Sequence, residues 1–145
     1  MLYFDTSYVA RLYLEDRGFA EVRRLAASDD IATARHGLLE TLAAFHRAFR
    51  ETRVEPAAFA QLQQQFRSDC AADGVQAFPL TEAVYHRAEA VYARASATTF
   101  LRAADALHLA CAAEHGFADI YSHDRHLLAA APLFGLRGVN IIPTI

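Results

Sequence analysis

Short apolar runs alternate along the chain with longer segments in which apolar residues recur every three or four positions. The short runs are typical of buried strands, and the longer segments are typical of amphipathic helices. The runs predict strands at residues 2–4, 31–34, 75–78, 118–121 and 138–142. The periodic segments predict helices at about 8–14, 19–27, 38–50, 56–72, 81–95, 101–114 and 125–130.

This order of elements predicts an α/β fold in three layers, with a mostly parallel sheet of four to five strands flanked by helices. No repeat, linker or low-complexity tract divides residues 1–145, so we expect a single domain. Right-handed crossovers bring the carboxyl ends of parallel strands to one edge of the sheet, where such folds place their sites. The polar residues that directly follow strands are therefore the first candidates for function.

Four acidic residues are candidates on this ground. Asp5 follows the first predicted strand and Asp124 follows the fourth, while Glu40 and Asp105 lie near the starts of two predicted helices. Each also has a purely structural explanation. Asp5 and Asp124 are suited to cap the helices that follow them, Asp105 is suited to pair with Arg102 three residues earlier, and Glu40 is suited to a solvated helix surface.

The charge composition excludes one phosphate-binding class and leaves nucleic acid open. All 14 basic residues are arginine, so the lysine that a P-loop requires is missing. The net charge of −3 combines 14 positive with 17 negative groups. If four carboxylates bind metal, 14 positive and 13 negative groups remain, so the acidity does not exclude an RNA substrate.

The sequence favours a cytoplasmic protein without membrane association. No apolar run approaches the roughly 18 to 20 residues that span a bilayer, and residues 1–5 lack the basic region of a secretory signal. Cys70 and Cys111 are too few for a disulfide framework and match no metal-binding spacing, so we expect two reduced thiols.

Three segments, taken in order, resemble the motifs of PIN-domain ribonucleases of the VapC toxin type. Residues 2–7, LYFDTS, resemble the opening motif, an apolar strand ending in Asp followed by hydroxyl residues. Residues 102–110, RAADALHLA, resemble the third motif, and residues 121–127, YSHDRHL, resemble the last. Glu40 matches the second acid of the family in position. The resemblance covers the whole chain and implies a metal-dependent endoribonuclease.

The resemblance also implies roles for individual residues. Asp5 and Asp105 would be the principal ligands of Mg²⁺ or Mn²⁺, with Glu40 and Asp124 binding through water or holding a second ion. Hydroxyl groups of Ser122 and of Thr6 or Ser7 would orient those carboxylates. Hard cations of this kind prefer oxygen ligands. The implied reaction hydrolyses RNA to a 5′-phosphate and a 3′-hydroxyl.

Two protein partners follow from the same resemblance. A VapB-type antitoxin would place its C-terminal segment in an apolar groove made by the first two helices and the fourth; the candidate lining residues are Tyr8, Leu12, Tyr13, Val22 and Leu25. A homodimer is also expected, and the aromatic residues available for its interface are Phe45, Phe49, Phe59 and Phe66. The alternative for both sets is that they only fill the core.

Several other interpretations stay open at this point. A catalytically silent PIN fold would serve only as a binding module, and a phosphohydrolase would use Asp5 as its nucleophile. His108, His123 and His126 lie close to the acids in sequence, but no His-Glu-x-x-His pattern is present, and structural or surface roles are favoured. Arginines that are candidates for phosphate contacts are Arg11, Arg47, Arg50, Arg53 and Arg125.

Overall fold

The computed structural model describes residues 1–144, in which five short strands form a parallel arrangement. The strands are β1 (Leu2–Tyr3), β2 (Ile31–Ala34), β3 (Gln76–Phe78), β4 (Asp119–Tyr121) and β5 (Arg137–Val139). β1, β2 and β3 form one sheet, and β4 and β5 form another. A single parallel bridge between Phe4 and Tyr121 joins them, with the Asp5 amide donating to the Tyr121 carbonyl at 3.0 Å. The predicted α/β fold with a parallel sheet is confirmed.

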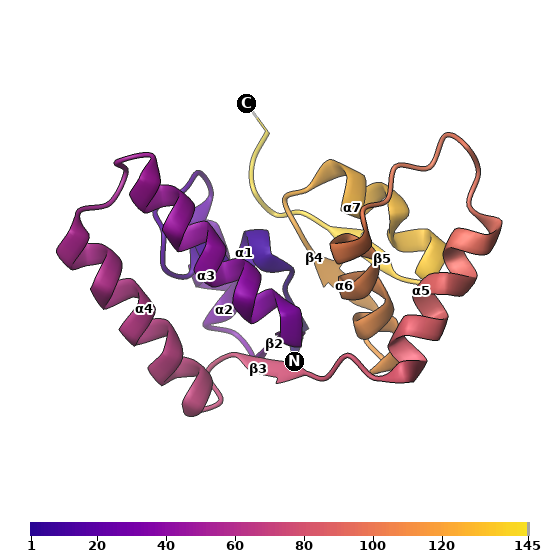
Figure 1. Cartoon of the computed structure of the whole chain (residues 1–145), viewed down its shortest axis with the longest axis horizontal. Helices are drawn as coiled ribbons and strands as arrows, with labels where there is room; N and C mark the ends of the chain where they lie inside the picture. The colour runs from indigo at the N-terminus through magenta and orange to yellow at the C-terminus, as the bar shows by residue number, and fades with distance from the viewer. Residues whose placement is uncertain (145) are drawn as a thin grey trace.

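Helices cover both faces of the strands (Figure 1). The N-terminal group comprises α1 (Thr6–Arg11), α2 (Phe19–Ala26), α3 (Arg35–Arg50) and α4 (Pro56–Ala71). The C-terminal group comprises α5 (Glu82–Arg94), α6 (Ala103–Glu114) and α7 (Arg125–Ala130), followed by the 3₁₀ helix η1 (Ala131–Phe134). The crossover from β3 to β4 consists of α5 and α6, which pack against each other.

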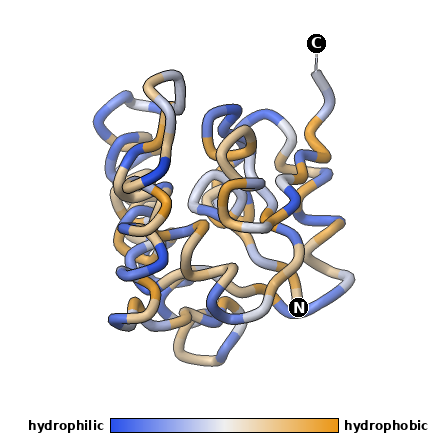
Figure 2. Tube along the Cα trace, turned by 90° about the vertical axis from the view of Figure 1, so that its right-hand side faces the viewer, coloured by the Kyte–Doolittle hydropathy of each residue, from blue (hydrophilic) through white to orange (hydrophobic). Residues whose placement is uncertain are grey.

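The core is divided in two by the strands, because successive strand side chains point to opposite faces. Tyr3 and Ala32 belong to the cluster beneath α5, α6 and α7. Their neighbours Phe4 and Ile31 belong to the cluster beneath α1 to α4. Hydrophobic and hydrophilic residues alternate along the helices (Figure 2), as expected of helices with one face on a core.

Most helices begin where the sequence places a cap. The side chains of Asp5, Thr81 and Asp124 accept hydrogen bonds from the first turns of α1, α5 and α7, and Pro56 opens α4. α3 begins at Arg35, three residues before the predicted start. Its first turn contains Gly37, which is buried inside the helix.

The expected thiol state and the absence of a membrane-spanning helix agree with the structure. Cys70 and Cys111 are both free. No helix among residues 1–144 combines the length and apolarity needed to cross a membrane.

Gly37 provides a test of the packing between α3 and α6. A Cβ at this position would lie 2.8 Å from Thr33 Oγ1 and 2.9 Å from His108 Cε1. Helix propensity alone would make Gly37→Ala stabilising by about 1 kcal/mol. We expect the opposite sign, a loss of about 1–3 kcal/mol in the free energy of unfolding, because the neighbours are buried and cannot give way. Urea denaturation measures the difference, and a variant as stable as wild type would contradict the close approach.

Candidate metal centre

The four candidate acids line one pocket of about 540 Å³ at the carboxyl ends of β1 and β4. Asp5 follows β1, and Asp124 lies three residues after β4. Glu40 projects from the first half of α3, and Asp105 from the first turn of α6. Thr6 and Ser7 line the same pocket, together with four arginines: Arg11, Arg47, Arg53 and Arg102. Acids that are up to 119 residues apart in sequence therefore face one space.

Asp5 is the most buried of these acids, with 5% of its surface exposed. Its carboxylate accepts hydrogen bonds from Ser7 Oγ at 2.6 Å, from Ser122 Oγ at 2.5 Å and from the Tyr8 amide at 3.2 Å. Burial raises the pKa of Asp5, and the nearby His108 and these donors offset only part of that rise. The carboxylate is thus held in one orientation at a site that penalises its charge.

Glu40 is held by a network of which only the Thr6 hydroxyl was predicted from the sequence. Its Oε1 accepts from Thr6 Oγ1 at 2.8 Å and lies 2.7 Å from His108 Nε2, while Tyr3 OH lies 3.3 Å from His108 Nδ1. Burial raises the pKa of Glu40, but the contacts with His108 and Thr6 outweigh it and leave the pKa lowered. Glu40 is therefore an anchored carboxylate, and the interpretation of it as an unpaired, solvated helix residue is wrong.

Asp105 and Asp124 share one basic partner. Arg102 Nε donates to Asp105 Oδ2 at 2.9 Å, and Arg102 Nη2 donates to Asp124 Oδ2 at 2.6 Å. The other oxygen of Asp124 caps α7 by accepting from the amides of His126 and Leu127. The Asp124 amide donates to Ser122 Oγ, whose own hydroxyl donates to Asp5. Ser122 thus connects the two acids that follow β1 and β4.

The other arginines of the pocket differ in their freedom to contact phosphate. Arg11 is buried, and its guanidinium donates to the carbonyls of Ser7 and Arg17. Nε and Nη1 are therefore used inside the protein, and the assignment of Arg11 as a phosphate contact stays a prediction. Arg47 and Arg53 are more exposed and pair with Glu51, and Arg53 also pairs with Asp16.

The donor set around the pocket fits Mg²⁺ or Mn²⁺. Four carboxylates supply only oxygen ligands, which hard divalent cations prefer, and their open arrangement leaves room for water on the ion. Among residues 1–144 no three of these acids bring carboxylate oxygens within 4.8 Å of one another, so an ion held by all four would bind some of them through water. The residues present would hold such an ion through Asp5, Asp105, Glu40 and Asp124.

A second donor set shares Glu40 with this pocket. Among residues 1–144, one group of three potential ligand atoms lies within 4.8 Å, and it consists of His36, Glu40 and His108. A mixed nitrogen and oxygen set of this kind suits zinc. However, His36 Nε2 lies 3.0 Å from the Ala104 carbonyl, and His108 Nε2 already binds Glu40. These hydrogen bonds explain both imidazole rings as structural neighbours of Glu40, without a bound metal.

His36 and the double contact of Arg102 are the site features that sequence reasoning missed. His36 precedes Glu40 by four residues, a spacing that places both on one face of a helix. That spacing was a usable signal. The contact of Arg102 with Asp124 spans 22 residues and depends on how α6 and α7 pack, which no local pattern reveals.

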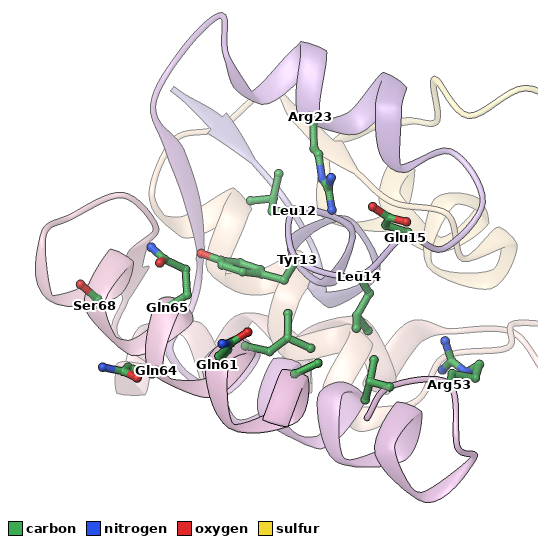
Figure 3. A pocket seen from close by; sticks show the side chains of 13 residues that line it. Leu12, Tyr13, Leu14, Glu15, Arg23, Arg53, Gln61, Gln64, Gln65 and Ser68 are labelled. Atoms are coloured by element: carbon green, nitrogen blue, oxygen red, sulfur yellow. The ribbon is translucent and has the colours of Figure 1, made fainter. Parts of the chain in front are cut away.

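A larger pocket, of about 950 Å³, lies between the segment that follows α1 and helix α4 (Figure 3). Leu12 and Tyr13 line it, as predicted for the apolar groove. Tyr8 and Val22 do not, because both are fully buried in the core, and Leu25 is half-buried outside the pocket lining. Of the aromatic residues considered for a dimer, Phe45 and Phe66 are core residues, and Phe49 and Phe59 stack on each other.

Comparisons with known proteins add a family and a fold. The model of the PIN domain family matches residues 2–132. No curated protein matches the chain. The structure is similar to the crystal structure of VapC20 from Mycobacterium tuberculosis, a toxin that cleaves the sarcin–ricin loop, with a TM-score of 0.70. The match covers 90% of this chain and 95% of VapC20 at 22% identity, which shows a shared fold.

The raised pKa of Asp5 predicts how the metal-free protein responds to pH. The folded protein keeps a proton on Asp5 at pH values where the unfolded chain has released it, so folding stability falls as pH rises through and above the ordinary Asp range. Asp5→Asn removes this titration. We expect the variant to melt at a higher temperature than wild type at pH 7.5 in chelator, where about 1 kcal/mol corresponds to about 2–4 °C.

The same scan at pH 4 is the control, because wild-type Asp5 is increasingly protonated there and the difference between the two proteins should shrink. A variant that is less stable than wild type by the same margin at both pH values would contradict a burial penalty on the Asp5 charge.

Proposed function

The chain belongs to the PIN-domain family, and on this basis we propose that it is a metal-dependent endoribonuclease of the VapC toxin type. The observation that carries the proposal is the arrangement of Asp5, Glu40, Asp105 and Asp124 around one pocket at the carboxyl ends of β1 and β4. The shared fold with VapC20, a toxin that cleaves an RNA loop, supports RNA as the substrate.

In this proposal Asp5 and Asp105 are the direct ligands of Mg²⁺ or Mn²⁺, and Glu40 and Asp124 complete the site through water or a second ion. A bound ion of this kind lowers the pKa of its water and neutralises charge that develops on the phosphate. Hydrogen bonds from Ser7 and Ser122 orient the Asp5 carboxylate, and a hydrogen bond from Thr6 orients the Glu40 carboxylate. The products would be a 5′-phosphate and a 3′-hydroxyl.

The hydrogen bonds support this division of labour. Each hydroxyl donates to a carboxylate oxygen, so the lone pairs that remain free on Asp5 and Glu40 have fixed directions. The arginines at the pocket supply positive charge for the RNA backbone, which the acids alone would repel. A catalytically silent binding module has no need of four acids converging on one polar pocket.

We also propose that a VapB-type antitoxin occupies the pocket beside α4. Leu12, Leu14, Val54 and Leu62 give it an apolar floor, and glutamines of α4 give it a polar rim (Figure 3). An amphipathic segment fits such a groove by placing apolar side chains inward. The pocket adjoins the acids, since Leu14 and Arg53 line both spaces. The homodimer and the cytoplasmic location stay predictions.

The acids should differ in their effect on RNA cleavage. Asp5→Asn and Asp105→Asn should each lower turnover by more than about 100-fold, because the loss of a direct ligand exceeds the 10–100-fold typical of supporting groups. Glu40→Gln should also cost heavily, and Asp124→Asn least. Cleavage of total RNA, mapped by its new 5′-phosphate ends, measures turnover with Mg²⁺ or Mn²⁺ and with excess EDTA.

Asp73→Asn is the matched control, because Asp73 lies in the turn between α4 and β3 with a φ of 60°, which asparagine tolerates well. It should cleave like wild type. Undiminished cleavage in EDTA would refute the metal requirement, and near wild-type turnover by Asp105→Asn would refute the assigned site.

A charge in the second pocket should separate antitoxin binding from catalysis. Leu12→Glu places a carboxylate on the apolar floor, and we expect the cognate antitoxin segment to bind more than about tenfold more weakly, since burying an unpaired charge is costly. RNA cleavage should be retained. Fluorescence polarisation with a labelled antitoxin peptide measures binding, and Gln64→Glu adds the same charge at the polar rim as a control. Equal affinity of the folded Leu12 variant and wild type would reject this groove.

A further inference from the structure

Arg102 lies at the solvent side of the two acids that it contacts. It is the residue immediately before α6, and its guanidinium donates to Asp105 through Nε and to Asp124 through Nη2. The side chains of Asp105 and Asp124 are 13% and 27% exposed, whereas that of Arg102 is 59% exposed. One exposed side chain thus contacts two largely buried carboxylates, from the first turn of α6 and the N-cap of α7.

The geometry makes the guanidinium a substitute for a divalent ion. Both carry positive charge, both bind carboxylate oxygens, and a planar fork with five donors is suited to joining two carboxylates. Asp105 and Asp124 offer the same oxygens, Oδ2 in each case, to this one group. A metal that takes the lone pairs now facing the guanidinium must therefore displace Arg102.

The other arginines of the pocket are engaged elsewhere. Arg11 donates to backbone carbonyls, and Arg47 and Arg53 pair with Glu51. Within residues 1–144, Arg102 is the arginine of this pocket that forms ion pairs with the candidate metal ligands. Its exposed position also means that release from the acids needs no rearrangement of the core.

We propose that Arg102 is an internal counter-cation that competes with the metal for Asp105 and Asp124 and, once displaced, binds the phosphate backbone of the RNA. The proposal rests on the function proposed above. In the metal-free protein Arg102 neutralises the repulsion between the two acids. In the loaded protein its guanidinium is released next to the site, where a phosphate is its natural partner.

The two proposed roles of Arg102 predict that Arg102→Ala changes the affinity for metal and the affinity for RNA in opposite directions. Loss of the competitor should strengthen metal binding, and loss of the phosphate contact should weaken RNA binding. Each of the two ion pairs of the exposed Arg102 is worth at most about fivefold in an equilibrium constant. We therefore expect Mn²⁺ to bind roughly three- to tenfold more tightly to the variant at low salt, and the difference to shrink at high salt. A merely structural ion pair predicts no tighter binding.

The test is calorimetric titration of Mn²⁺ alone into wild type, Arg102→Ala, Arg102→Lys and Arg47→Ala, each checked for folding by circular dichroism. Arg47→Ala is the matched control, because it removes the same charge from the same pocket without touching the acids. Its Mn²⁺ affinity should stay within about twofold of wild type. Arg102→Lys keeps the charge but loses the fork, so its affinity should lie between those of wild type and Arg102→Ala.

Cleavage kinetics at saturating Mn²⁺ give the second readout. Arg102→Ala should raise KM for a single-stranded RNA by about tenfold or more, by analogy with the loss of a charge-assisted hydrogen bond, with a smaller change in kcat. Folded Arg102→Ala that binds Mn²⁺ no more tightly than wild type would overturn the competition, and an unchanged KM would overturn the phosphate contact. Wild-type protein that neither binds Mn²⁺ nor cuts RNA would overturn the proposed function itself, and this inference with it.

Discussion

The gathering of four carboxylates around one pocket is the constraint on which the rest of this site depends. Asp5, Glu40, Asp105 and Asp124 face one pocket, and each is given a different means of tolerating its charge. Asp5 receives two serine hydroxyls and a backbone amide, and Glu40 receives a histidine and a threonine. Asp105 and Asp124 share an arginine. These partners matter because a carboxylate that is taken out of water without hydrogen bonds or an opposite charge is costly.

Structural and functional explanations of these acids turn out not to exclude each other. Asp5 caps α1 and Asp124 caps α7, as their positions after strands predict. Each carboxylate has two oxygens, and Asp124 uses one for its cap and offers the other to the pocket. A residue at the start of a helix that follows a strand is therefore well placed for both tasks, since the cap fixes the direction of the second oxygen.

The sequence allowed the fold, Asp5 and Asp124 to be predicted because they depend on local patterns, whereas Glu40 and Asp105 depended on the resemblance to PIN-domain motifs. Strands, helix caps and the spacing of Asp5 and Asp124 after their strands are visible within a few residues. The start of α3 was placed three residues late because Gly37 lies in its first turn, and the approach of His108 that requires a glycine there is not visible in the sequence. Tyr8 and Val22 were misplaced in a groove because periodicity identifies the apolar face of a helix without saying whether that face meets core or solvent.

The bridge between Phe4 and Tyr121 has a further consequence for how the molecule moves. It is the seam between a three-stranded and a two-stranded sheet, and the polar site lies directly above it. Asp5 and Glu40 belong to the half with α1 to α4, whereas Asp105 and Asp124 belong to the half with α5 to α7. A cation bound by all four acids would therefore link the two halves. The Asp5 amide donates to the Tyr121 carbonyl across this seam, so its hydrogen exchange measures how often the seam opens. Exchange at this amide would then be slower when the cation is bound.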